Sequence, residues 1–192
     1  YKGYTDKALP VDVKVTYTLD GKEIKPEDLA GKSGKLTVRY DYTNNDKKTV
    51  KINGKKTDIY VPYLMATTAI LDTNVYSNVE VTNGKLISDG SRQILIGVAM
   101  PGLTKSLDLQ DNEDIEIPEY VEFTADVKDF ESTTALTVAT SDIFSKLDLS
   151  DIGDADDLQD KLDELSDATD ELVDGTAELY AGIKNAEAGI RS

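Results

Sequence analysis

Apolar residues in this chain recur with two different periods, and the change from one to the other divides the sequence. Valine, tyrosine and leucine alternate with polar residues over Val11–Leu19, a period of two that is typical of a strand with one buried face. Further along, leucines recur every seven residues from Leu158 to Leu179. A period of seven is typical of an amphipathic helix that packs against another helix. The sequence therefore predicts a β-rich body followed by a helical segment.

The heptad segment carries two columns of apolar residues, one of leucines and one of alanine and glycine. Each glycine inside a helix costs roughly 1 kcal/mol relative to alanine, so we interpret the small residues as places of close helix approach. We expect this helix to self-associate in a longer protein, and the alternative is a single helix that docks back on the sheets. The predicted helix–helix interface comprises Leu158, Leu165, Ala168, Leu172, Gly175, Leu179, Gly182 and Gly189.

Turn signals separate the β-forming runs that precede the heptads, at intervals of about eight to twelve residues. Asn53-Gly54 predicts a hairpin, and Asn83-Gly84 predicts a turn between two further strands. Residues 63–71 are almost continuously apolar, which suits a buried strand or a short helix, and we favour the strand. The pattern predicts a mostly β fold, an antiparallel β-sandwich of immunoglobulin-like or similar type.

We expect three parts along the chain: a β-sandwich domain (1–147), an acidic connector (148–154) and the start of a coiled-coil-like heptad helix (155–192). The chain begins at Tyr1 and ends inside the heptad pattern, so we expect it to be a piece of a longer protein. Its apolar stretches fall short of the roughly 20 residues that cross a bilayer. Membrane attachment is therefore expected only through segments outside this chain.

The chain of 192 residues contains no cysteine and no histidine. It therefore lacks thiolate nucleophiles, disulfides and the commonest general base near neutral pH, which disfavours most enzyme classes. The net charge of −16 is uneven, since residues 1–107 hold 16 Lys+Arg and 12 Asp+Glu whereas residues 108–192 hold 5 and 25. Such an acidic second half disfavours nucleic acid as a partner.

Two acidic clusters could ligate a calcium ion, which takes six to eight oxygen ligands. Neither cluster has the spacing of an EF-hand loop, so we favour a solvated loop for the first and helix-capping acids for the second. No metal ligand is predicted. The first cluster is Asp108, Asp111, Glu113, Asp114 and Glu116, and the second is Asp148, Asp151, Asp154, Asp156 and Asp157.

Tyrosines could form a platform for a carbohydrate or a peptide, because aromatic faces stack on sugars and tyrosine is favoured at interfaces. Most of them occupy alternating strand positions, so we favour packing in the core or on a sheet face. No catalytic residue and no cofactor is predicted. The tyrosines concerned are Tyr17, Tyr40, Tyr42, Tyr60, Tyr63, Tyr76 and Tyr120.

Two heptads, Glu171-Leu172-Val173-Asp174-Gly175 and Glu178-Leu179-Tyr180-Ala181-Gly182, resemble the Leu-x-x-Gly repeats of bacterial surface proteins. These proteins include the extracellular segment of phage infection protein (Pip) relatives. Upstream, Leu9-Pro10-Val11-Asp12-Val13 and Leu29-Ala30-Gly31-Lys32-Ser33-Gly34 are similar to the β-rich module that precedes such repeats in exported proteins of Gram-positive bacteria. The resemblance implies an extracellular, cell-envelope location and supplies no catalytic residue or ligand.

These features together predict a non-enzymatic cell-surface module with a structural or interaction role. The sandwich would recognise a protein or glycan of the envelope, and the heptad helix would form a stalk. Two alternatives stay open: a carboxylate-based hydrolase of glycosidase type, because acids are abundant, and a calcium-dependent adhesin.

Overall fold

The computed structural model describes residues 8–52, 55–88, 92–107, 109–110 and 116–141. The chain separates into two units, Tyr1–Ser141 and Asp142–Ser192, and the described residues all belong to the first. The predicted acidic connector (148–154) and the predicted heptad helix (155–192) lie outside the described residues.

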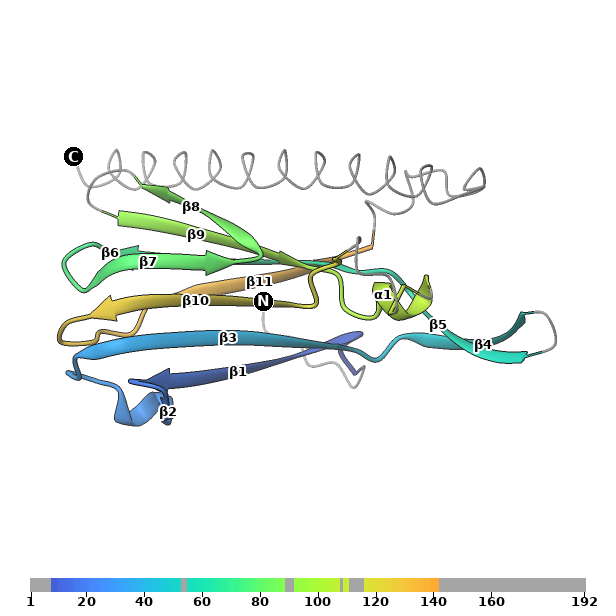
Figure 1. Ribbon diagram of the computed structural model, residues 1–192, viewed down its shortest axis with the longest axis horizontal. Coiled ribbons are helices and arrows are strands. Elements are labelled where there is room, and N and C mark those ends of the chain that lie inside the picture. The colour runs from blue at the N-terminus through green and yellow to red at the C-terminus, as the bar shows by residue number, and fades with distance from the viewer. Residues whose placement is uncertain (1–7, 53–54, 89–91, 108, 111–115, 142–192) are drawn as a thin grey trace, which may run out of the picture. The chain divides into compact units, whose positions relative to one another are not determined.

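A five-stranded antiparallel sheet, in the order β2-β1-β3-β10-β7, forms one layer of the first unit (Figure 1). Its strands are β1 (Val11–Leu19), β2 (Lys22–Glu23), β3 (Gly34–Asn44), β7 (Tyr76–Thr82) and β10 (Tyr120–Val127). The register of β1 on β3 places apolar residues of the two alternating strands directly opposite each other, so that they share one face. The strand predicted at Val11–Leu19 is confirmed.

A four-stranded antiparallel sheet, in the order β11-β6-β9-β8, forms the second layer. Its strands are β6 (Leu64–Asp72), β8 (Gly84–Ser88), β9 (Arg92–Ala99) and β11 (Ala135–Thr140). The apolar run at 63–71 is confirmed as a strand, since β6 covers almost all of it. Neighbours in β6 such as Leu64 and Met65 are both buried, which explains why the strand is apolar at successive positions.

A hairpin made of β4 (Lys47–Ile52) and β5 (Lys55–Tyr60) connects β3 to β6, and the two strands pair antiparallel as Asn53-Gly54 predicts. Figure 1 shows that the hairpin extends away from the two larger sheets. The remaining elements are a 3₁₀ turn, η1 (Pro26–Asp28), and a short helix, α1 (Leu103–Ser106).

One turn predicted from the sequence connects strands of different sheets. β7 pairs with β10 and β8 pairs with β9, so Asn83-Gly84 does not join two paired strands. Asn83 adopts a φ of 60°, and its carbonyl accepts a hydrogen bond from the Val98 amide at 2.8 Å. Asn83 Nδ2 donates to the Tyr120 carbonyl at 2.9 Å. Asparagine tolerates positive φ in a crossing between sheets as well as in a hairpin, so the residue pair alone did not distinguish the two.

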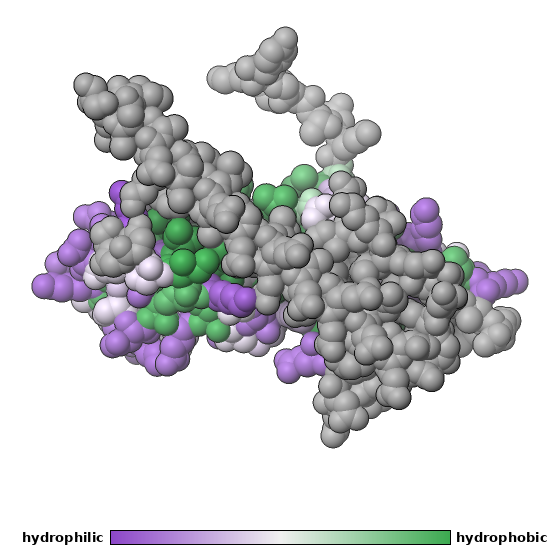
Figure 2. All heavy atoms as spheres, turned by 90° about the horizontal axis from the view of Figure 1, so that it is seen from above, coloured by the Kyte–Doolittle hydropathy of each residue, from purple (hydrophilic) through white to green (hydrophobic). Residues whose placement is uncertain are grey.

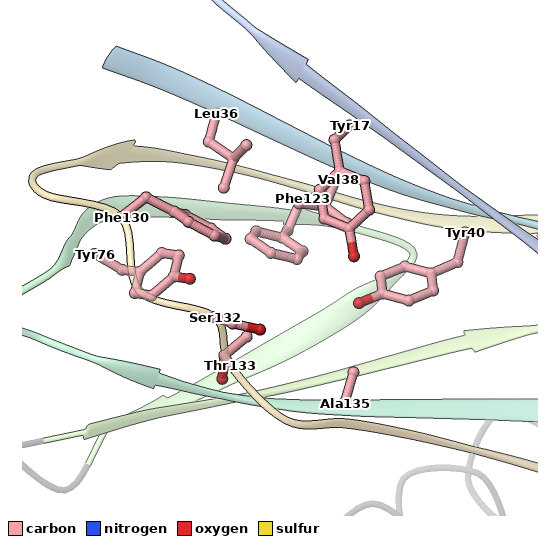
Figure 3. A pocket seen from close by; sticks show the side chains of 10 residues that line it. All are labelled: Tyr17, Leu36, Val38, Tyr40, Tyr76, Phe123, Phe130, Ser132, Thr133 and Ala135. Atoms are coloured by element: carbon pink, nitrogen blue, oxygen red, sulfur yellow. The ribbon is translucent and has the colours of Figure 1, made fainter. Parts of the chain in front are cut away.

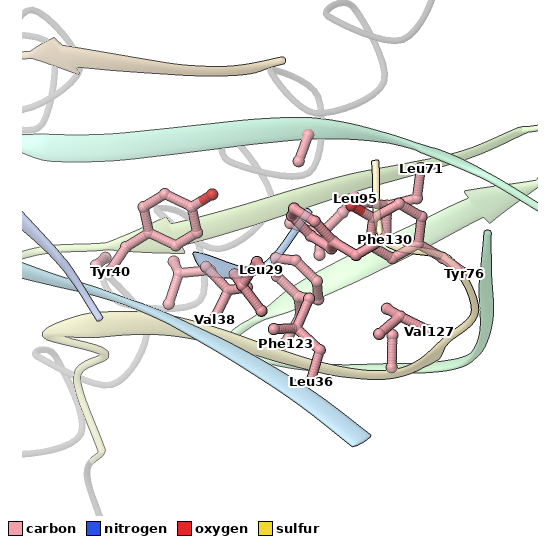
Figure 4. Close-up of a cluster of buried hydrophobic side chains, with 14 of the residues drawn as sticks. Leu29, Leu36, Val38, Tyr40, Leu71, Tyr76, Leu95, Phe123, Val127 and Phe130 are labelled. Atoms are coloured by element: carbon pink, nitrogen blue, oxygen red, sulfur yellow. The ribbon is translucent and has the colours of Figure 1, made fainter. Parts of the chain in front are cut away.

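The two sheets share one hydrophobic core (Figure 4). Aromatic and branched side chains from both layers meet there, and Tyr76 and Phe130 contact each other edge to face, with ring centroids 6.1 Å apart. A Cβ atom at Gly97 of β9 would collide with both γ-methyl groups of Val121 on β10, so glycine allows these strands to approach closely. The mostly β fold with antiparallel sheets is therefore confirmed. None of the helices in the described residues has the length and hydropathy that a bilayer span requires.

Candidate interaction surfaces

The shared core is open along one side, between β1 and β11. Val13 and Val15 of β1 pair with Tyr42 and Tyr40, which are 7% and 6% exposed, so all four side chains lie on the core face. Val13 and Val15 are nevertheless 41% and 37% exposed. We call this region the open side, and define it as Val13, Val15, Tyr17, Ala135, Thr137 and Ala139.

Small side chains on β11 explain the open side. Tyr17 of β1 and Ala135 of β11 line the same cavity, which places β11 across from β1. The register of β11 on β6 sets Ala135, Thr137 and Ala139 on the core face, opposite buried residues of β6. Alanine and threonine are too short to fill the space beneath Val13 and Val15. Apolar surface on both strands therefore stays in contact with water.

The edge of β11 is the second feature of this region. Among the described strands β11 pairs with β6 alone, so along Ala135–Ala139 the other edge of β11 has no strand partner in the described part of the chain. Edge strands are commonly protected by charged residues or proline, and the sequence Ala135–Thr140 contains neither. Leu136 and Val138, on the outward face of β11, are 63% and 50% exposed. Such an edge favours pairing with another extended segment.

A cavity of about 50 Å³ lies between the sheets beside the open side (Figure 3). The hydroxyl groups of Tyr17 and Tyr40 turn into it, and Ser132 and Thr133 contribute two more hydroxyls to its lining. Burial raises the pKa of Tyr17 and of Tyr40 above the usual range, which keeps both phenols protonated. A space of this size holds a few water molecules at most. It is a gap in the core and is too small for a sugar or a peptide.

A chain of hydroxyl groups ties the two sheets together next to this cavity. Tyr42 Oη on β3 and Thr67 Oγ1 on β6 are 2.5 Å apart, and Thr67 Oγ1 lies 2.8 Å from Thr137 Oγ1 on β11. Thr67 is fully buried, so its hydroxyl needs partners inside the protein. The contacts hold β11 against β6 and link β6 to β3 across the core.

The tyrosines mostly pack as the sequence indicates. Tyr40, Tyr42 and Tyr76 are buried in the core, which confirms the packing interpretation for these three. Tyr120 is half-buried, and the guanidinium carbon of Arg39 lies 3.6 Å from the centroid of its ring. The half-buried rings come from β1, from β5, from the segment that joins β5 to β6, and from β10, and they are Tyr17, Tyr60, Tyr63 and Tyr120.

The predicted interface residues of the heptad segment all lie outside the described residues. They are Leu158, Leu165, Ala168, Leu172, Gly175, Leu179, Gly182 and Gly189. Glu116 is the one described member of the two acidic clusters, and it is exposed. Within the described part of the chain, no three acidic side chains come close enough to hold a metal ion.

The open edge of β11 was not found from the sequence. Its sequence signal is a β-forming run without a charged residue or proline, but that signal also suits a central strand. Only the strand order reveals that β11 is at an edge.

Comparisons with protein-family models, with curated proteins and with solved structures find no match to this chain.

Proposed function

We propose that the chain is a non-enzymatic structural and interaction module of the cell envelope, built as an immunoglobulin-like β-sandwich that carries a heptad-helix stalk. The resemblance of its Leu-x-x-Gly heptads to bacterial surface proteins supports the envelope location. The open side supports the interaction role, because it combines exposed apolar side chains with an edge that has no described strand partner.

The partner that fits this region is an extended segment of another envelope protein. Main-chain hydrogen bonds to β11 would give affinity, as in other cases of strand addition to a sheet edge. The added strand would extend the four-stranded sheet beneath Val13 and Val15 and remove their side chains from water. The single observation that carries the proposal is the uncharged, exposed edge at Leu136 and Val138.

Photo-cross-linking on cells tests this role. A photoreactive amino acid in place of Val138, in the chain displayed on a Gram-positive cell, is expected to cross-link one protein. The same reporter in place of Glu80, on the exposed β7 edge of the other sheet, is expected not to cross-link that protein. A glycan turned over by the purified chain, with no protein cross-linked, would instead support the hydrolase.

A matched pair of substitutions then separates edge pairing from simple proximity. Leu136→Lys adds the kind of charge that protects natural edge strands, and it is expected to abolish cross-linking from position 138. Leu136→Thr keeps β propensity without a charge and is expected to retain most of the cross-linking. Equal yields from the two variants would contradict strand addition at β11.

A further inference from the structure

The β4–β5 hairpin is a basic arm on an acidic protein. Residues 47–60 contain five lysines and one acidic residue, Asp58, whereas the whole chain has a net charge of −16. The arm extends away from the two larger sheets in Figure 1. Figure 2, which keeps the horizontal direction of Figure 1, shows hydrophilic residues at this end of the molecule.

Strand alternation gathers ammonium groups on one face of the arm. Lys47 Nζ lies 2.7 Å from Asp58, and Thr49 Oγ1 donates to Asp58 at 2.7 Å, which defines this face. Lys51 belongs to the same face, and the register sets it directly opposite Lys56. Like charges directly opposite each other destabilise a strand pair, and a two-stranded hairpin is only marginally stable by itself. An anion between Lys51 and Lys56 would remove that repulsion.

The base of the hairpin is fixed to the body by buried polar contacts. Asn44 is 7% exposed, and its Nδ2 donates to the carbonyls of Val61 and Pro101 at 2.8 and 3.1 Å. The Tyr60 amide donates to Ser106 Oγ at 2.9 Å. The Lys105 Nζ atom of α1 lies 5.7 Å from the centroid of the Tyr60 ring, so it adds a positive charge near the base of the arm. The arm therefore has a fixed root and an exposed distal half.

The opposite face of the arm carries an apolar residue among lysines. Val50 follows Thr49, so it points away from Asp58, and it is 36% exposed. Lys48 shares that face. A soluble polyanion could neutralise the lysines but would leave Val50 in water, whereas the headgroup layer of a bilayer offers both anions and apolar contact.

The length of the arm separates its distal lysines from the acidic residues of the two larger sheets. Six residues per strand span about 20 Å, whereas the Debye length in physiological salt is about 8 Å. In physiological salt the field of the acidic residues in these sheets is therefore largely screened at the distal lysines.

We propose that the β4–β5 hairpin binds end-on to the surface of a bilayer that contains anionic phospholipids. Its distal half enters the headgroup layer, so that Lys51 and Lys56 on one face contact lipid phosphates while Val50 on the other face is removed from water. This is a peripheral contact made by the described residues, and it is independent of the strand addition proposed for β11.

Sedimentation of the whole chain with lipid vesicles tests the proposal. Binding is expected to vesicles of phosphatidylcholine mixed with phosphatidylglycerol, to be absent with phosphatidylcholine alone, and to fall as salt is added. Lys51→Gln with Lys56→Gln is expected to lower the partition coefficient roughly thirtyfold, about fivefold for each lysine. The matched control, Lys14→Gln with Lys22→Gln, removes the same charge from exposed lysines of β1 and β2 and is expected to change little.

Val50→Ser distinguishes a membrane from a soluble polyanion. It is expected to weaken vesicle binding by at least about threefold and to leave binding of inorganic polyphosphate unchanged. Three results would overturn the proposal: no binding to the anionic vesicles, an equal loss in the control pair, or tight polyphosphate binding together with vesicle binding that Val50→Ser does not alter. Because all five residues are exposed, thermal melts of the variants should match the parent chain.

Discussion

Buried tyrosines determine how the described unit responds to alkaline pH. Burial raises the pKa of Tyr42 to about 12 and that of Tyr76 to about 12, from an ordinary value of 10.0. A tyrosine with a raised pKa holds its proton more tightly in the folded protein than in the unfolded chain. Its contribution to stability is therefore complete below pH 10.0 and is lost as the pH rises through about 12.

Urea unfolding measured across this pH window is expected to show a steep loss of stability. Each of the two tyrosines would contribute on the order of 3 kcal/mol to the decline, since one pKa unit corresponds to about 1.4 kcal/mol. Tyr76→Phe removes one of these ionisations, although it also loses the hydrogen bond from Tyr76 Oη to the Glu131 carbonyl at 2.8 Å. The variant should begin less stable at neutral pH and lose less stability above pH 10.0. Parallel curves for variant and parent would show that Tyr76 does not titrate in this range.

At the scale of elements, the close contact between β9 and β10 is a point where the two sheets pack tightly against each other. Gly97→Ala would place a methyl group against both γ-methyls of Val121, which is fully buried, and overpacking of this kind costs about 1–3 kcal/mol. Val121→Ala makes room at the cost of a cavity. We expect the double variant to be no less stable than Val121→Ala alone in urea unfolding. Additive losses would mean that the clash at Gly97 is not with Val121.

Elements with strong local signals were predicted correctly, and so was the pairing within the β4–β5 hairpin, whereas the order of distant strands was not predicted. Alternation at Val11–Leu19 and the Asn53-Gly54 pair each determine a local structure, because side-chain period and positive φ act within a few residues. The crossing at Asn83 and the edge position of β11 depend on which distant strands pair. The hairpin was predicted from Asn53-Gly54, but its fixed root depends on a contact between Asn44 and Pro101, which are 57 positions apart in the sequence.

At the scale of the whole molecule, both the net charge and the spacing of the apolar residues change along the chain. The acidic half, with 5 Lys+Arg and 25 Asp+Glu, contains the heptads, whereas the basic arm lies in the first half. An acidic helix with a leucine column stays soluble while it keeps one apolar stripe for a partner. The heptad segment is therefore the part of the sequence from which we predict assembly, and the sheets are the part from which we predict recognition.

Self-association through the heptads is expected to grow with their number. The four leucines in register from Leu158 to Leu179 make a short seam, so we expect this chain to be monomeric or weakly dimeric at micromolar concentration and a longer chain with more heptads to associate tightly. Leu172→Asp should weaken association of the longer chain without changing its β-sheet circular dichroism. Ala177→Asp, on the far side of the same heptad, is the matched control and should associate normally. A tight dimer of this chain in sedimentation equilibrium would contradict the expected weak association. An equal loss of β-sheet signal in Leu172→Asp would show that the leucine column packs within the fold, which would rule out the stalk.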